Sequence, residues 1–421
     1  MIAARRPRTL SRRTVLGFGA AAGLMPAAAW AESEPLKVGF LTVNTGPLAA
    51  GGKQMEEGLT QFLKERDGTL AGRKIELITA DSGGQPAQAK TKTQELVERS
   101  NVQVIIGPLA TYEALAIDDY LRQGQVPLIT PTSAASLDLR GGREVNPWVI
   151  HAVGTAPQVT HPLGEYAAKT LGYKRIATIA DDFTYGHEGV SGFQRSFEDN
   201  GGKIVQKLWP PLNVTDYGPF IAQIKRDVDA VYIGFAGVNG LRFLKQYAEY
   251  GLHDKIPVLG NTTSTDEGIL RVMGDEALGV VTAGWYAAGL QSPDNYRFVE
   301  AIRVAYGHDP GFYTAGTYTA GLFLENALNA LKGDTANPAA LRDTLRKTWI
   351  VAGPIGSIKL DAYGTPILDV HIRKVERRNG RLVNAIVTTY HDVSQFWTYD
   401  PRQFLAEPPY SRDFPVAKHL E

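Results

Sequence analysis

A threonine stands where a strand-like segment meets a helix-like one, at Thr111 in "VIIGPLATYEAL" (residues 104–115). The β-branched run stops at Gly107-Pro108, and a polar helical stretch begins at the threonine. The first N–H groups of a helix lack partners within the helix and carry partial positive charge, so they suit a carboxylate. Two roles are therefore open: Thr111 caps its own helix, or its hydroxyl helps to hold an anion in front of that helix.

The other chemically capable residues are adjacent acids and histidines, and none forms a catalytic pattern. Neighbours in sequence do not share a helical face, so His187-Glu188 is interpreted as a surface pair. The sequence contains no G-x-S-x-G, H-E-x-x-H, Walker or EF-hand motif and no cysteine. We therefore expect neither an enzyme nor a metal or cofactor site. Two acidic pairs are interpreted as a solvated helix face and a strand-to-helix turn: Asp118-Asp119 and Asp181-Asp182.

Strand-like and helix-like segments alternate from Leu36 onward. Such alternation predicts a parallel sheet with right-handed crossovers. The pattern restarts after residue 174, and 421 residues are too many for one ordinary core. The sequence therefore predicts an α/β fold with two similar lobes. The strands are expected at 36–43, 74–81, 102–107 and 126–131, then at 174–182, 229–237, 256–261 and 278–286; the helices are expected at 55–66, 87–100 and 111–124, then at 185–202 and 241–251.

The last third of the chain reads differently. Two helices are expected at 295–307 and 317–333, followed by strand-like residues 357–390 with Asn379-Gly380 as a hairpin turn. Residues 393–421 are rich in proline and aromatic side chains. We expect this C-terminal extension to pack over a surface as an irregular segment.

The N-terminus has the pattern of an export signal. "RRPRTLSRRTVLGFGAAAGLMPAAAWA" has five arginines and no acid, then a short apolar stretch rich in Gly and Ala, and it ends in A-x-A. The apolar run is too short for the alternative, a transmembrane anchor, and Ser11-Arg12-Arg13 resembles a twin-arginine signal. Removing residues 1–31 leaves a charge of (44 − 5) − 44 = −5. We predict a periplasmic protein, cleaved from its signal, without a nucleic-acid partner.

The order of the segments resembles the periplasmic solute-binding proteins of ABC importers, in the branched-chain-amino-acid-binding (type I) family. The resemblance covers roughly residues 36–389. It rests on seven segments in the family's order: "KVGFLTVNTGPLAAGGKQMEEGL", "RKIELITADSGGQPAQAKTKTQELV", "VIIGPLATYEALA", "VPLITPTSA", "IADDFTYGHEGVSGF", "DAVYIGFAG" and "LGNTTSTDE".

The resemblance implies two Rossmann-like, doubly wound lobes that close on a ligand about a hinge. It places the three chain crossings near Gly154, Trp285 and Ala352. The N-terminal lobe would then contain residues 36–153 and 286–352, and the C-terminal lobe residues 154–285 and 353–392.

The resemblance also implies a set of ligand contacts. Thr111 matches a hydroxyl that grips the ligand's carboxylate, and Thr132 matches a backbone contact. Tyr185 matches a ligand-covering aromatic residue, against the alternative of a tyrosine packed in a turn. Ala236 replaces a second aromatic residue of many relatives. The further expected contacts are Tyr112, Ser133, Phe235, Thr262 and Trp285, with Trp285 and Tyr286 also open to plain hinge packing.

The pattern departs from the family where an amino-acid ligand's ammonium would bind. The matching positions are Ala134 and Thr262, and neither offers a carboxylate. A buried ammonium without one is costly, unless Asp266 or Glu267 takes the role. The sequence therefore favours an organic acid without an α-amino group, such as a benzoate or phenylpropanoid, with a branched-chain or other amino acid as the alternative.

The expected role is a monomeric transport receptor that delivers its ligand to an ABC permease. A ligand sensor and an exported hydrolase on the same scaffold are the competing functions. The export signal opposes the first, and the missing nucleophile pattern opposes the second.

Overall fold

The first sheet of the protein is largely buried, except along its longest strand, residues 73–81. The computed structural model describes Met1 and residues 34–132 and 145–421. The strand order is β2-β3-β1-β4-β5-β6, with β1, β3, β4, β5 and β6 parallel. The signal-like segment, Ser133 and Ala134 lie outside the described residues. The strands are β1 (Leu36–Thr42), β2 (Thr69–Leu70), β3 (Arg73–Asp81), β4 (Val104–Ile106), β5 (Leu128–Thr130) and β6 (Val149–His151).

The second sheet repeats the same winding. Its parallel part runs β8-β7-β9-β10-β11, the same order as β3-β1-β4-β5-β6 of the first sheet. The repeat confirms the predicted α/β fold of two doubly wound lobes. We call the two sheets with their helices the first and second lobes. The strands are β7 (Arg175–Ala180), β8 (Lys203–Leu208), β9 (Ala230–Gly234), β10 (Val258–Gly260) and β11 (Val281–Gly284).

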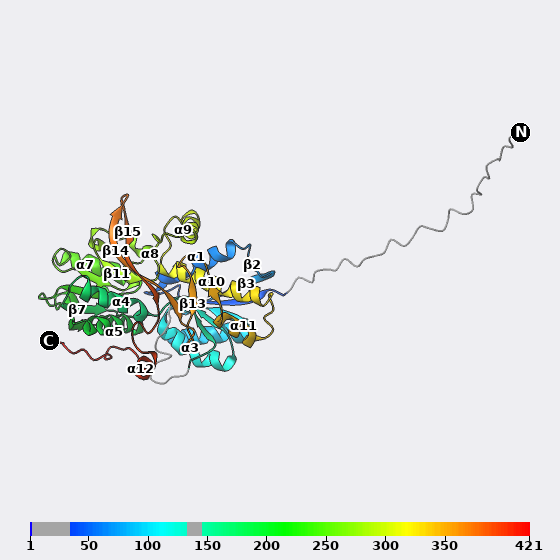
Figure 1. The fold of residues 1–421 in the computed structure, drawn as a ribbon, viewed down its shortest axis with the longest axis horizontal. Helices are drawn as coiled ribbons and strands as arrows, with labels where there is room; N and C mark the ends of the chain where they lie inside the picture. The colour runs from blue at the N-terminus through cyan, green and yellow to red at the C-terminus, as the bar shows by residue number, and fades with distance from the viewer. Residues whose placement is uncertain (2–33, 133–144) are drawn as a thin grey trace. The chain divides into compact units, whose positions relative to one another are not determined.

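Helices cover the sheets (Figure 1). Figure 1 shows α1, α3, α10 and α11 with the first sheet and α4, α5 and α7 with the second. The first lobe has α1 (Ala49–Lys64), α2 (Pro86–Gln94), α3 (Thr111–Gly124), α9 (Pro293–Tyr306), α10 (Phe312–Ala330) and α11 (Pro338–Arg346). The second lobe has α4 (Ala156–Lys169), α5 (Thr184–Asp199), α6 (Gly218–Ile221), α7 (Asn239–Glu249) and α8 (Glu267–Leu270).

A long antiparallel hairpin extends the second sheet. β14 (Pro366–Arg378) pairs with β11 and with β15 (Arg381–Val393), and at its start it pairs with β13 (Ile358–Leu360), which continues to β12 (Trp349–Ile350). The turn falls at Asn379-Gly380, both with positive φ (51° and 77°). The predicted hairpin and its turn are therefore confirmed.

The C-terminal extension packs over a surface, as predicted; that surface belongs to the second lobe, and the extension contains one short helix, α12 (Pro401–Ala406). Phe396, Phe404 and Tyr410 form a small apolar cluster. The Tyr410 hydroxyl lies 2.9 Å from His161 Nε2 of α4, and the Arg195 guanidinium of α5 bonds the Glu407 carboxylate at 2.5 and 3.0 Å. The extension is thus fastened across α4 and α5.

The structure corrects the interpretation of two pairs of adjacent residues, Asp118-Asp119 and His187-Glu188. Asp118 is buried and accepts a hydrogen bond from Asn146 Nδ2 at 2.9 Å, so it is not on a solvated helix face. Glu188 is also fully buried, so His187-Glu188 is not a surface pair. His187 instead lies 2.7 Å from Asp182 through its Nε2 atom. Both acids were misassigned because the packing partners of their helices come from distant parts of the sequence.

Candidate ligand-binding site

The predicted contact residues gather at the carboxyl ends of the strands. Thr111 follows β4 and Thr132 follows β5 in the first lobe; Tyr185 follows β7, Thr262 follows β10 and Trp285 follows β11 in the second. Ligands of doubly wound sheets bind outside these strand ends, where the strand order reverses. In this structure these strand ends of both lobes line one cavity.

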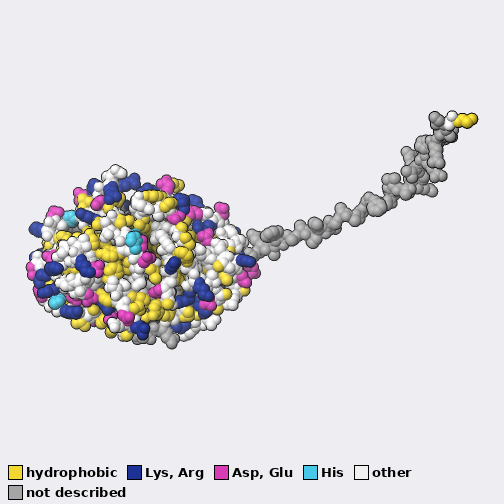
Figure 2. Space-filling model, viewed as in Figure 1, with side chains coloured by type: hydrophobic (Ala, Val, Ile, Leu, Met, Phe, Trp, Pro, Cys, Tyr) yellow, Lys and Arg dark blue, Asp and Glu magenta, His cyan; other side chains and the backbone are white. Residues whose placement is uncertain are grey.

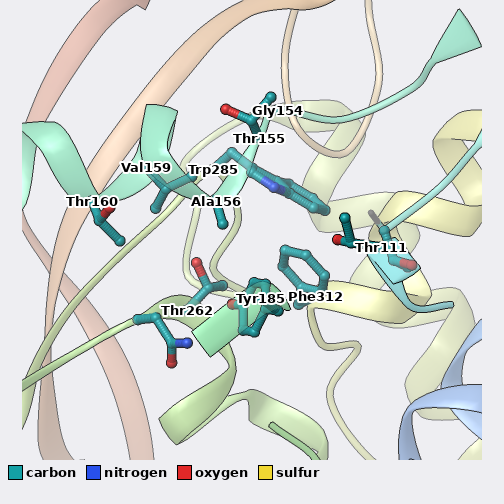
Figure 3. A pocket seen from close by; sticks show the side chains of 12 residues that line it. Thr111, Gly154, Thr155, Ala156, Val159, Thr160, Tyr185, Thr262, Trp285 and Phe312 are labelled. Atoms are coloured by element: carbon teal, nitrogen blue, oxygen red, sulfur yellow. The ribbon is translucent and has the colours of Figure 1, made fainter. Parts of the chain in front are cut away.

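Two adjoining cavities lie between these strand ends. The empty space in and around them, open solvent included, is about 360 Å³ and 310 Å³, and they share Thr111, Thr132, Tyr185 and Phe312. The described lining contains hydroxyl, amide and apolar side chains but no charged one (Figure 3). The larger cavity is also lined by Gly154, Thr155, Ala156, Val159, Thr160, Asn261, Thr262 and Trp285. The smaller is also lined by Leu48, Leu109, Ala110, Phe183, Ala236, Thr263 and Tyr313.

Thr111 is the first residue of α3 and not its cap. The N-cap is Ala110, whose N–H donates to the Glu113 carboxylate at 3.0 Å, and Glu113 is held by the Ser82 hydroxyl at 2.5 Å. Gly107, at the end of β4, approaches the Leu41 backbone so closely that an added Cβ would stand 2.1 Å from Leu41 O, and its φ of 130° also favours glycine. The capping role of Thr111 is therefore wrong, and its buried hydroxyl lines both cavities.

The amino ends of three helices meet at the cavities. α3 begins at Thr111, α4 is capped by Thr155, and Tyr185 is in the first turn of α5; all three residues are in the lining. Each helix start contributes N–H donors and partial positive charge. The cavities are therefore suited to an anion although the described lining holds no cationic side chain.

Aromatic rings form the walls. The Trp285 and Phe312 ring centroids are 4.5 Å apart, and Tyr185 lines the same space (Figure 3). The Tyr185 hydroxyl is hydrogen-bonded to Thr263 Oγ1 at 3.2 Å. Burial raises the pKa of Tyr185 to about 12, so its hydroxyl stays neutral at physiological pH. Flat apolar walls with a neutral phenol suit a planar ligand.

Several predicted residues have structural duties. Phe235 is fully buried in the second lobe's core against Tyr217 and Phe243, and it lines neither cavity. Tyr112 donates its hydroxyl to Gly84 O at 2.9 Å and lines neither of these cavities but a separate surface pocket. Thr262 lines the larger cavity, but its hydroxyl donates to Ala283 O at 2.7 Å, so that hydrogen is not available to a ligand.

The two acids that could hold an ammonium are committed to protein groups. Asp266 Oδ1 accepts from Phe312 N–H at 2.6 Å, and Oδ2 accepts from Gln54 Nε2 at 2.9 Å. Burial raises the pKa of Glu267 to about 7; its Oε1 accepts from Ala288 N–H at 3.2 Å, and its Oε2 lies 3.9 Å from the buried Arg373 guanidinium. Neither acid lines either cavity.

The sequence did not reveal every wall of the cavities. Phe312 and Tyr313 start α10 after a Pro-Gly turn, Thr155 caps α4, and Thr160 is one turn further along α4. Thr155 could have been found from its capping position two residues before Pro157. The sequence did not indicate that Asn261 lines a cavity, because a single amide side chain after a strand is compatible with any turn.

The described residues offer little for other chemistries. They contain no group of three or more His, Asp or Glu placed to hold a metal ion. None of their helices has the length and apolar character needed to cross a bilayer. Basic and acidic side chains are interspersed over the face seen in Figure 2.

Two like-wound lobes around a shared cavity define a two-lobed solute-binding protein. The chain belongs to the periplasmic binding protein family, whose model matches residues 35–381. The Leu/Ile/Val-binding protein homolog 6 of Brucella melitensis is 28% identical over 372 residues, covering 86% of this chain and 94% of the relative.

Solved structures give the same result. An ABC transporter substrate-binding protein from Sphaerobacter thermophilus is 33% identical with a TM-score of 0.79, covering 86% of this chain and 99% of that one. A solute-binding protein of an ABC transporter from Rhodopseudomonas palustris BisB5, in complex with 3,4-dihydroxybenzoic acid, is 32% identical with a TM-score of 0.81, covering 88% and 99%. The predicted family, fold and transporter-receptor role are confirmed, and the family is one of binding proteins and not of enzymes.

Proposed function

We propose that this ABC-transporter receptor captures a small aromatic monocarboxylate between its lobes. The observation that carries the proposal is the lining: three helix amino ends and several hydroxyls, aromatic walls, and no acidic side chain in the described part of the cavities. The ligand's carboxylate lies against the start of α3, beside the Thr111 hydroxyl and the backbone of Thr132. Its ring lies between Trp285, Phe312 and Tyr185.

An amino acid is the second candidate, because the Brucella relative is named for leucine, isoleucine and valine. The committed acids weigh against it. An ammonium would enter a cavity of helix amino ends with no carboxylate in its described lining. An unpaired buried ammonium costs several kcal/mol, which corresponds to more than about a thousandfold in affinity. The dihydroxybenzoate bound by the Rhodopseudomonas palustris relative agrees with an aromatic acid.

The rest of the proposal concerns the whole chain. Residues 1–31 are a twin-arginine-type signal that is cleaved on export, and the mature protein works as a monomer in the periplasm. Its lobes contain residues 36–153 with 286–352 and residues 154–285 with 353–392. The chain crosses between them near Gly154, Trp285 and Ala352. The lobes close on the ligand about this hinge, and the loaded receptor then delivers the ligand to the permease.

Calorimetric titration with three ring compounds and leucine tests the ligand class. Benzoate and cinnamate are expected to bind, while benzamide, which keeps the ring but not the charge, and leucine bind at least about tenfold more weakly. Tight leucine binding would replace the aromatic acid with an amino acid. Equal affinities for benzamide and benzoate would contradict an anion site at the start of α3.

A further inference from the structure

The larger cavity has two chemically different ends. Figure 3 shows Thr111 on one side of the lining and Thr160 on the other, with the rings of Trp285 and Phe312 between them. Thr111 belongs to the helix start that suits a carboxylate. The opposite end belongs to the second lobe and includes Thr160 of α4 and Asn261, which follows β10.

The Asn261 amide is held in one orientation. The Phe235 N–H donates to Ser264 Oγ at 3.2 Å, so the Ser264 hydroxyl hydrogen is free to point to Asn261 Oδ1, 2.6 Å away. The Asn261 backbone N–H donates to Ile233 O at 3.1 Å, which fixes the residue at the end of β10. Because Oδ1 is occupied on the Ser264 side, Nδ2 is directed away from it.

This Nδ2 group is a buried donor without an acceptor. Asn261 is 2% exposed, and its Nδ2 has no hydrogen-bond partner among the described residues. Gly189 lies beside this amide and has no side chain: an added Cβ would stand 4.0 Å from Nδ2 and 3.1 Å from the Tyr232 hydroxyl, which is also unpartnered in this part of the chain. Buried amide donors are almost always hydrogen-bonded, so an acceptor from outside the chain is expected here.

We propose that Asn261 Nδ2 donates a hydrogen bond to an oxygen substituent on the ligand's ring, and that Asn261 thereby selects ring-oxygenated aromatic acids over bare or alkylated ones. The inference rests on the proposed function, because it takes the carboxylate at Thr111 as the other anchor. Two fixed donors at opposite ends also explain how a cavity without charged lining can orient a flat ligand.

Matched ligand pairs test the proposal on the wild-type protein. The pairs are 4-hydroxybenzoate with 4-methylbenzoate and 3-hydroxybenzoate with 3-methylbenzoate, since hydroxyl and methyl are close in size and only the hydroxyl accepts a hydrogen bond. In at least one pair the hydroxy acid is expected to bind about tenfold or more tightly by calorimetry, because the methyl acid leaves Nδ2 buried and unpaired. Equal affinities in both pairs would mean that a trapped water serves Asn261, and would overturn the proposal.

The Asn261→Leu variant removes the donor while keeping the side-chain size. It is expected to abolish the hydroxy-over-methyl preference, whereas Asn213→Leu, on an exposed loop outside both cavities, keeps it. A preference that survives in a folded Asn261→Leu protein would contradict the assignment. If Asn261→Leu does not fold, the wild-type pairs decide. Failure of every acid to bind would reject the proposed function itself, a result distinct from equal binding within each pair.

Discussion

Thr111 shows how a neighbouring residue decides what a side chain is free to do. Glu113 bonds the Ala110 N–H, so the start of α3 is served by a carboxylate from within the helix. The Thr111 hydroxyl is then not needed as a cap and lies in the lining of both cavities. The same helix start that stabilises the fold therefore presents a hydroxyl next to unpaired N–H groups.

Replacing Thr111 with valine tests whether its hydroxyl serves the ligand and not the helix cap. Thr111→Val is expected to weaken benzoate binding by about 1–3 kcal/mol, through loss of a hydrogen bond to a charged group. The unliganded stability should change little, because the cap is Ala110. Calorimetry and thermal unfolding measure the two effects, with Thr111→Ser as the control that keeps the hydroxyl. An unchanged dissociation constant in the valine variant would take Thr111 out of the site.

Thr111, Thr132, Tyr185 and Trp285 each follow a strand in a recognisable motif, and all four line the larger cavity; their contacts with a ligand stay a prediction. Phe235 lines neither cavity, because neighbouring residues at the end of a strand point in opposite directions. Its ring enters the core, and Ala236 faces the smaller cavity. The direction of a side chain at a strand end depends on register, which one sequence does not fix.

At the scale of elements, β14 carries a buried histidine. Burial lowers the pKa of His371 from 6.5 to about 4, and its Nδ1 lies 2.9 Å from the Thr389 hydroxyl of β15. The folded protein therefore holds this imidazole neutral, while the unfolded chain protonates it below about pH 6.5. The contribution of the neutral His371 to the free energy of unfolding is complete above about pH 6.5 and is lost as the pH falls toward 4.

A urea-denaturation series from pH 7 to pH 4 measures this loss. The wild type is expected to lose on the order of 2–3 kcal/mol more than His371→Asn over this range. His253→Asn, at a more exposed loop position, serves as the control and should follow the wild type. Parallel curves for wild type and His371→Asn would show that β14 does not hold the imidazole neutral.

The C-terminal extension behaves as a structural element although most of it is irregular. Phe404 is 1% exposed and contacts Phe396, Tyr410 and His161 edge to face. The Arg195 guanidinium lies 3.9 Å from the Tyr399 ring centroid. The sequence indicated a packed segment by its aromatic content, but not its location, because the receiving surface comes from α4 and α5.

Truncating Phe404 is expected to loosen this contact without reaching the ligand. Phe404→Ala should cost about 3 kcal/mol of stability, as for other buried phenylalanines, and leave the benzoate dissociation constant unchanged. Val416→Ala in the same segment, 71% exposed, should cost almost nothing. Urea denaturation and calorimetry give the two readouts. A large change in affinity would instead connect the extension to the cavity.

At the scale of the whole molecule, the two lobes touch at backbone distance. A Cβ on Gly237 of the second lobe would stand 2.6 Å from Pro47 O of the first lobe, and Gly237 has a φ of 58°. Asp266 of the second lobe also bonds Gln54 and Phe312 of the first. These contacts describe lobes that are closed on one another.

Gly237→Ala is expected to oppose closure. The added methyl group should weaken benzoate binding by about tenfold or more and reduce the compaction seen by X-ray scattering when ligand is added. Gly251→Ala is the matched control: its φ is 68°, but nothing lies within 4 Å of its Cβ, so it shares the backbone strain without the contact between lobes. Equal losses of affinity in both variants would attribute the effect to strain alone.

The double winding was predictable as a whole because two blocks of alternating strands and helices need two sheets. Four strands escaped prediction: β2 and β12 have two residues each, β6 has only three, and β8 is half-exposed along much of its length. The position of the lobes relative to one another was not predictable. It depends on contacts such as Asp266 to Gln54, whose partners are 212 residues apart.

The carboxylate that Asp266 places across the interface has a consequence for measured affinities. Part of the free energy that favours lobe closure comes from this contact within the protein. A small ligand therefore needs to supply only the rest of the free energy of closure. Loss of the Asp266 contact would lower the affinity for every ligand by the same factor, and the order of the ligand affinities would not change.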